Sequence, residues 1–217
     1  MKSPCMRAVA TVLVTAVAAT AGLIAQGAAP QATELKDPKP RPDLVAYPYT
    51  QADVEFMQGM IPHHAQAVKM CRMAPTHAGK PQVKLMCERM LTSQSDEIRM
   101  MRIWLLDRGQ YVPPPDATHH KMTMPGGATH DMLMPGMLTD EDMARLDKAR
   151  GNDWDRMFLQ FMIKHHQGAI KMVEDLLDSA GGAQGDDIYG FASDVFADQT
   201  AEIERMEKLL EVKESLQ

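Results

Sequence analysis

The sequence has few aromatic side chains and no run of basic residues, and both shortages narrow the functions that it can have. Phe, Tyr and Trp make up 5% of the 217 residues, whereas 45% of the residues are hydrophobic and 20 are methionine. A core is therefore possible, but flexible thioethers supply much of its volume. The formal net charge is −6 and no Lys/Arg cluster occurs, which excludes a broad nucleic-acid surface and favours cations as ligands.

The one long apolar run lies at the N-terminus and has the three parts of a secretory signal peptide. Lys2 and Arg7 precede an apolar stretch over residues 8–25, and small residues follow up to Pro30. We expect residues 1–29 to be a signal peptide, with an uncleaved N-terminal anchor as the alternative. Both alternatives place the rest of the chain in the periplasm or outside the cell, and we expect no membrane insertion of the mature chain.

The rest of the chain contains the same set of sequence motifs twice. Residues 53–70 and 155–172 share Asp, Phe, Met-Ile-x-His-His, Ala and Met in register, and residues 94–101 and 199–206 share Gln-x-x-Glu-Ile-x-x-Met. Apolar residues recur in these segments at spacings of three and four, which predicts helices. Each repeat therefore predicts two helices joined by a short turn, and Pro62 should kink the first helix without ending it.

Two matching hairpins, each with one apolar face, predict an all-α fold in which they pack as a four-helix bundle with ferritin-like topology. Thr139 and the acidic residues after it predict the start of an extra short helix. The expected segments are a Pro-rich extended tether without a fold at 30–48 and the bundle at 49–216, divided into repeat one at 49–109, a long Met/His loop at 110–138 and repeat two at 139–216.

Two of the three cysteines lie in repeat one. Cys71 and Cys87 flank a turn-like segment at 75–81, so in an exported protein they can form a disulfide across the helical hairpin. A thiolate pair for a soft metal is the alternative. Repeat two has Val173 and Ala192 at the aligned positions, and a ligand needed by both repeats should not be missing from one. We therefore favour the disulfide.

The repeated Met-x-x-His-His motif has the donor atoms of a copper site. On a helix Met60 lies three residues from His63 and four from His64, so its thioether can approach either ring, whereas the two rings point about 100° apart. A thioether with an imidazole suits both oxidation states of copper. The opposing helix can add Met101 or Glu97 to one site and Met206 or Glu202 to the other. The expected ligands in the bundle are Met60, His63, His64, Met101, Met162, His165, His166 and Met206.

A purely structural role is the alternative for the same residues. Methionine at helical spacing usually fills a core, and a buried histidine often only hydrogen-bonds a neighbouring carboxylate such as Glu97. The duplication does not decide between the two roles, because either would be copied with the repeat.

The loop between the repeats provides a second group of candidate ligands. Its Pro and Gly residues argue against a helix, and a loop offers no core for thioethers to fill. Flexible Met and His arrays outside the cytoplasm can capture Cu(I) or Ag(I), and an oxidation-prone linker is the alternative. The candidate loop ligands are His119, His120, Met122, Met124, His130, Met132, Met134 and Met137.

The order of these motifs resembles the bacterial family called domain of unknown function 305. The family pattern is Asp-x-x-Phe-x-x-x-Met-Ile-x-His-His-x-x-Ala-x-x-Met followed by Gln-x-x-Glu-Ile-x-x-Met, and the resemblance covers about residues 49–211. It implies a ferritin-like helical bundle and an exported protein. For the members with an assigned role, it implies periplasmic copper binding or copper tolerance.

We therefore expect a periplasmic protein that sequesters or passes on copper ions through Met and His ligands in copper tolerance. A structural or interaction bundle of the cell envelope that binds no metal is the alternative. We expect no enzyme, because ferritin-like di-metal carboxylate proteins use Glu-x-x-His pairs and the sequence has none.

Overall fold

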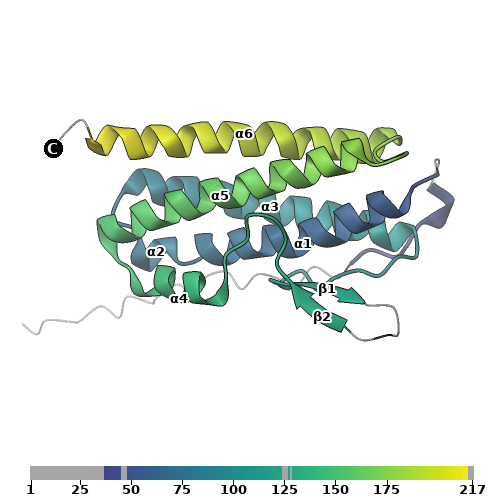
Figure 1. The fold of residues 1–217 in the computed structure, drawn as a ribbon, viewed down its shortest axis with the longest axis horizontal. Helices are drawn as coiled ribbons and strands as arrows, with labels where there is room; N and C mark the ends of the chain where they lie inside the picture. The colour runs from purple at the N-terminus through teal and green to yellow at the C-terminus, as the bar shows by residue number, and fades with distance from the viewer. Residues whose placement is uncertain (1–36, 45–47, 124–126, 128, 215–217) are drawn as a thin grey trace, which may run out of the picture. The chain divides into compact units, whose positions relative to one another are not determined.

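The structure, a computed structural model, describes residues 37–44, 48–123, 127 and 129–214, with only the backbone described at 121–123, 129–130 and 212–214. The expected signal peptide lies outside the described residues. Within them the chain is mostly helical, which confirms the all-α prediction (Figure 1). The elements are η1 (Pro42–Leu44), α1 (Gln51–Cys71), α2 (Ala74–His77), α3 (Pro81–Asp107), β1 (His120–Thr123), β2 (Thr129–Met132), α4 (Asp140–Lys148), α5 (Gly151–Asp178) and α6 (Asp186–Glu214).

Two of the helices, α1 and α4, begin at capping residues of the sequence. The backbone N–H of Asp53 donates to Oγ1 of Thr50 (3.3 Å), and the N–H of Thr50 donates back to the Asp53 carboxylate (2.8 Å). Thr139 caps α4 by accepting from the N–H of Asp142 (3.2 Å). Pro62 lies inside α1, and the helix continues past it as expected.

Four long helices build the core of the described residues. α1 packs along α3 and α5 along α6, while α1 also contacts α5 and so joins the two hairpins (Figure 1). The buried apolar side chains form two clusters, one containing Met60 and Met101 and the other Met162 and Met206. None of the helices described combines the length and hydrophobicity needed to cross a bilayer.

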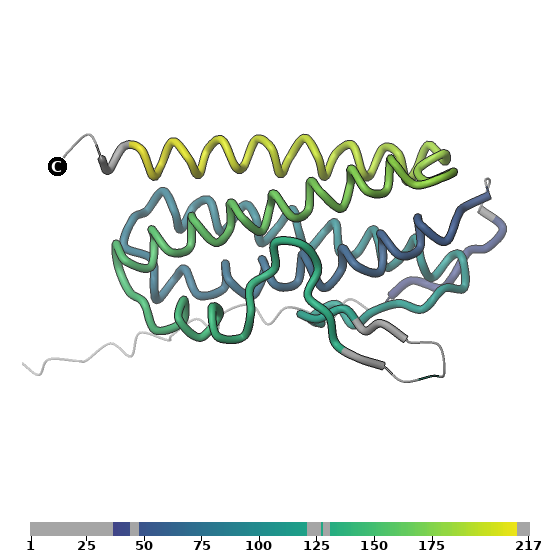
Figure 2. The backbone as a smooth tube through the Cα atoms, in the orientation of Figure 1, coloured from purple at the N-terminus to yellow at the C-terminus, as the bar shows by residue number. Residues whose placement is uncertain are grey.

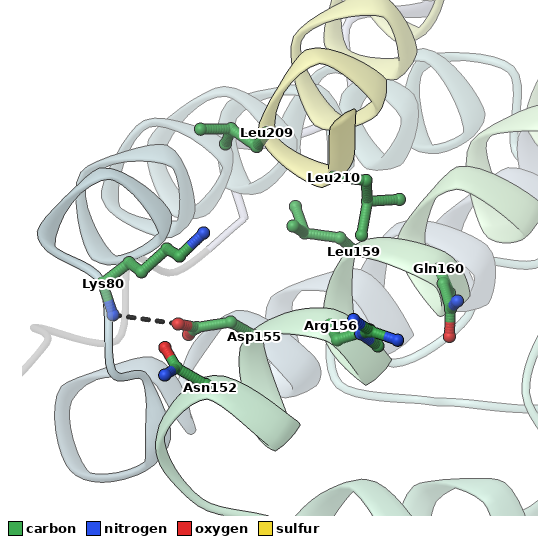
Figure 3. A pocket seen from close by; sticks show the side chains of 8 residues that line it. All are labelled: Lys80, Asn152, Asp155, Arg156, Leu159, Gln160, Leu209 and Leu210. Carbon is green, nitrogen blue, oxygen red and sulfur yellow. Dashed lines mark hydrogen bonds between the residues drawn. The ribbon is translucent and has the colours of Figure 1, made fainter. Parts of the chain in front are cut away.

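The Asp that starts each repeated motif holds the turn of the other repeat. Oδ1 of Asp53 on α1 accepts from the N–H of Ala183 in the α5–α6 turn (2.7 Å). The carboxylate of Asp155 on α5 accepts from the N–H groups of Gly79 (3.0 Å) and Lys80 (2.9 Å), before α3. Figure 3 shows the Lys80 bond at the edge of a cavity of about 110 Å³. These reciprocal bonds tie the repeats together.

The described part of the tether differs from the extended segment that we expected. Asp37 pairs with Arg102 of α3, and the backbone N–H of Arg41 donates to Asp107 at the end of the same helix (2.7 Å). A short 3₁₀ turn at Pro42–Leu44 lies between these contacts and α1. The prediction of no fold was wrong here because composition does not reveal partners on a distant helix.

The segment between α3 and α4 also differs from the expected loop. It contains an antiparallel hairpin of β1 and β2, in which His120 is opposite Met132. After β2 the chain passes over α1 to α5 and then reaches α4 (Figure 2). The side chain of Gln66 on α1 accepts from the N–H of Leu138 (2.7 Å) and donates to its carbonyl (2.9 Å). These bonds satisfy backbone groups that docking removes from water.

Gly168 permits the close approach of this segment to α5. A Cβ at Gly168 would overlap the carbonyl of Pro135, and the neighbouring Gly136 has φ +77°. The segment is therefore fitted against the helices that carry the histidines.

Cys71 and Cys87 are free, buried thiols in this structure and do not form the disulfide that we favoured. Burial, and then a hydrogen bond with Cys87, raises the pKa of the Cys71 thiol. The Cys71 thiol is therefore a neutral group of the core at neutral pH.

Candidate metal centre

The four histidines of the two motifs meet in the core where α1 contacts α5. The rings of His63 and His165 are tilted by 41° to each other, with their centroids 3.8 Å apart. His64 lies 6.3 Å from His63, and His166 lies 6.1 Å from His165. None of the four is more than 1% exposed. The two helices thus bring together a buried cluster of four imidazoles, called the histidine cluster below.

The second histidine of each motif points to a carboxylate of its own repeat. Nε2 of His64 bonds Oε2 of Glu97 on α3, and Nε2 of His166 lies 2.6 Å from Oε2 of Glu202 on α6. An Nε2–H that donates to a carboxylate leaves the lone pair on Nδ1. In both rings Nδ1 is buried without a hydrogen-bond partner. A carboxylate that fixes the tautomer of an imidazole is also the usual support of a metal-binding histidine.

The first histidine of each motif has even fewer partners. Nε2 of His63 donates to the carbonyl of Pro135 (3.0 Å), and its Nδ1 has no hydrogen-bond partner among the described residues. Neither ring nitrogen of His165 has a partner in that part of the chain, and the backbone of His63 only opposes the lowering of the His165 pKa. The docked segment after β2 therefore orients His63. Neither ring gains enough hydrogen bonds here to account for its burial.

Both central rings are neutral at physiological pH. Burial, reinforced by the charge of His64, lowers the pKa of His63 to about 3, and the bond to Pro135 acts in the opposite direction. Burial, followed by the charge of His63, lowers the pKa of His165 well below its usual range. Neutral imidazoles keep the lone pairs that bind a metal, so the protonation states suit a ligand role.

The thioethers predicted as ligands occupy the core on both sides of the contact. Met60 and Met101 come from the two helices of repeat one, and Met162 and Met206 from those of repeat two, and all four are fully buried. Among the described residues no three His, Cys, Asp or Glu side chains already form a metal-holding group. The histidine and methionine side chains of these helices would therefore have to reorient before their nitrogen and sulfur atoms could bind one metal ion.

The loop residues divide into packed and partly exposed groups. Met137 is 5% exposed and Met134 packs against the core, so the expectation that these thioethers have no core to fill was wrong. His119, His120 and Met132 are half-buried. Met124 lies outside the described residues, and only the backbone is described at Met122 and His130, where the two residues face each other across the hairpin.

His119 and His120 lie beside Pro62 of α1. The two rings and Pro62 help to line a cavity of about 110 Å³. Burial lowers the pKa of His120, while a hydrogen bond with the backbone of Gln58 acts in the opposite direction. Pro62 has no N–H to donate to the Gln58 carbonyl, so this histidine takes the place of the missing helix bond.

Two glutamates outside the set of expected ligands orient the outer rings of the cluster. Glu97, predicted from the sequence as a hydrogen-bond partner of a buried histidine, binds His64, and Glu202 binds His166. The buried amide of Gln94 has no hydrogen-bond partner among the described residues. The repeated Gln-x-x-Glu spacing on α3 and α6 marks these positions in the sequence. Burial, and then the negative charges of Glu97 and Glu202, raise the pKa of Asp198.

Comparison with known proteins gives the following relatives. The pattern of the family described as "Domain of unknown function (DUF305)" matches residues 53–210. A DUF305 fragment from Deinococcus radiodurans is 29% identical, with a TM-score of 0.60 over 76% of this chain and 98% of its own. A DUF305 candidate secreted protein from Streptomyces coelicolor is 28% identical, with a TM-score of 0.61 over 73% and 91%.

CopM in its Cu(I)-bound form is 25% identical, with a TM-score of 0.56 over 76% of this chain and 97% of its own. CopM is also known in Cu(II)-bound and Ag-bound forms. No curated protein matches the chain.

Proposed function

The chain belongs to the DUF305 family, and from this membership and its histidine cluster we propose that it is a copper-binding protein of the cell envelope. The observation that carries the proposal is the set of buried ring nitrogens without partners at His63, His64, His165 and His166. An unpaired buried polar atom costs about 1–3 kcal/mol. A ligand that occupies these nitrogens compensates for that cost.

The donor set fits copper better than a hard cation. Neutral imidazoles and thioethers suit Cu(I) and Cu(II), whereas Mg²⁺ and Ca²⁺ prefer oxygen. Nδ1 of His64 and of His166 would bind the ion while Glu97 and Glu202 hold the opposite ring nitrogens. The relationship to CopM, which binds copper and silver, supports the same choice.

The remaining parts of the proposal concern the setting of the site. The two hairpins would form a ferritin-like four-helix bundle that presents the ligands from facing helices. The leader-like N-terminus and the Streptomyces relative support export to the periplasm or the cell exterior. The protein would sequester or pass on copper without catalysing a reaction.

Anaerobic titration of the mature chain with Cu(I) against a competing chelator tests the proposal. We compare wild type with His63→Gln and His165→Gln, and use His77→Gln as a matched control, because His77 is buried but binds Asp147 outside the cluster. The cluster variants should bind Cu(I) about tenfold more weakly or worse, and the control should not.

A variant of the loop that carries His119 and His120 is included in the same titration. A His119→Gln/His120→Gln variant should keep the tight binding of wild type if the ion occupies the core. If the cluster variants bind as tightly as wild type, the histidines are structural and the proposal fails.

A further inference from the structure

Three sulfur atoms meet in the core of repeat one, outside the histidine cluster. Sγ of Cys71, at the end of α1, lies 3.8 Å from Sδ of Met90 on α3. Cys87 lies one turn before Met90 on the same helix, close enough to contribute to the raised pKa of the Cys71 thiol. None of the three residues is more than 1% exposed. Two thiols and one thioether therefore share a dry pocket.

Packing alone does not require sulfur at these places. The aligned positions of repeat two hold Val173, Ala192 and Val195, and all three are fully buried. The same places in the fold are thus filled there by aliphatic side chains. The sulfur atoms are an addition to repeat one, whereas the histidines occur in both repeats.

We propose that Cys71, Cys87 and Met90 form a second metal site for a soft monovalent cation, Cu(I) or Ag(I). Thiolates and thioethers are the preferred donors of such ions, and two sulfurs one turn apart on α3 face a third on α1. The site is separate from the histidine cluster and does not depend on the function proposed for it.

Binding exchanges protons for the ion. Each thiol that becomes a ligand releases its proton to solvent, so one monovalent cation with two thiolates and a neutral thioether carries a net charge of −1. Without an ion the Cys71 thiol stays protonated, because burial raises its pKa. No electron is transferred in this step.

Glu202 lies between the histidine cluster and the surface. Its carboxylate binds His166, and its charge is the smallest of the causes that raise the pKa of Cys71. The same residue lines a groove of about 380 Å³ between α3 and α6, together with the basic side chains Arg89, Arg205 and Lys208.

The test replaces the three sulfurs by the residues of repeat two, as Cys71→Val/Cys87→Ala/Met90→Val. Wild type and variant, as mature chains under anaerobic reducing conditions, are titrated with Ag(I) and with Cu(I) in parallel, and metal–sulfur bonds are followed by X-ray absorption. The variant should keep its helical circular dichroism and lose one bound equivalent of each ion. Should it not fold, Cys87→Ser alone should weaken that equivalent about tenfold or more.

A His63→Gln/His165→Gln protein separates the two sites. It should retain the sulfur-bound equivalent, so loss of the histidine site alone leaves the present proposal standing. The proposal is overturned if the triple variant binds as many ions as wild type. It is also overturned if the chain purified from the envelope contains Cys71 and Cys87 as a disulfide.

Discussion

At the scale of single residues, the main feature is a set of imidazoles that are buried without enough hydrogen bonds. His64 and His166 each bind a glutamate through one nitrogen, and His63 binds a backbone carbonyl, but His165 binds nothing in the described structure. A purely structural histidine would be expected to satisfy both nitrogens or to be replaced by an apolar residue. The incomplete hydrogen bonding of these four imidazoles favours a role as metal ligands.

Replacing His165 by leucine should separate stability from function. His165→Leu removes two unpaired buried nitrogens, so the free energy of unfolding of the metal-free protein should rise by about 1–3 kcal/mol. Copper affinity should fall at the same time. Urea unfolding with and without Cu(I) measures both effects, and a less stable metal-free variant would contradict the ligand role.

The central histidines should also make the metal-free protein sensitive to acid. The pKa of His63 is about 3 in the folded protein and near 6.5 when exposed, and that of His165 is lowered in the same direction. Above pH 6.5 the folded and unfolded states are both neutral at these rings. Below it the unfolded state binds protons that the folded state does not, so stability falls as the pH falls towards 3.

The slope is about 1.4 kcal/mol per pH unit for each ring at most. Urea unfolding between about pH 7.5 and about pH 5 measures it. The His165→Leu protein should show a shallower slope. An equal slope in both proteins would show that His165 does not carry the effect.

At the scale of elements, residues 133–139 between β2 and α4 pack against the two helices that bear histidines, and this segment is called the clamp below. It binds Gln66 of α1, accepts from His63 and lies directly against Gly168 of α5. Contacts with this one segment thus explain why the repeated motifs have Gln66 and Gly168 at these positions. The orientation of His63 depends on this docking.

Gly168→Ala should displace the clamp, because the new Cβ would overlap the Pro135 carbonyl. We expect a loss of about 1–3 kcal/mol in stability and weaker copper binding, since His63 loses its acceptor. Gly190→Ala on α6 is the matched control, because its Cβ would meet nothing within 4 Å. The control should gain about 1 kcal/mol from helix propensity. Thermal unfolding of both variants measures the difference. Equal changes in Tm for Gly168→Ala and Gly190→Ala would contradict the role of the clamp.

The sequence predicted the helices well because their signals are local. Thr50 and Thr139 are caps that act within one turn, and periodicity needs only neighbouring residues. The docking of Leu138 on Gln66 joins residues 72 positions apart, and no local pattern encodes it. The close contact of the His63 and His165 rings is equally long-range, so the sequence identified the residues but not their arrangement.

At the scale of the whole molecule, the described helices form two hairpins, α1 with α3 and α5 with α6, that reciprocal hydrogen bonds join. Asp53 holds the turn at Ala183, and Asp155 holds the turn at Gly79 and Lys80. The same two residues begin the helices that carry the histidines. The position of one motif relative to the other therefore depends on these carboxylates.

Asp155→Ala should weaken the hydrogen bonding between the two hairpins. It leaves two backbone N–H groups without their acceptor, and we expect a loss of about 2–4 kcal/mol in the free energy of unfolding. Glu55→Ala on the exposed side of α1 serves as the control and should change stability by less than about 0.5 kcal/mol. Urea unfolding of both variants checks the difference, and a loss as small as that of the control would show that Asp155 is not needed to join the two hairpins.

The most direct measurement of the central claim is anomalous diffraction at the copper edge from crystals of the Cu(I)-loaded protein. We predict an ion in the core between α1 and α5, bonded to nitrogens of the histidine cluster. Copper found only on the loop of His119 and His120 or in the sulfur pocket, with the four rings arranged as in the metal-free protein, would contradict it.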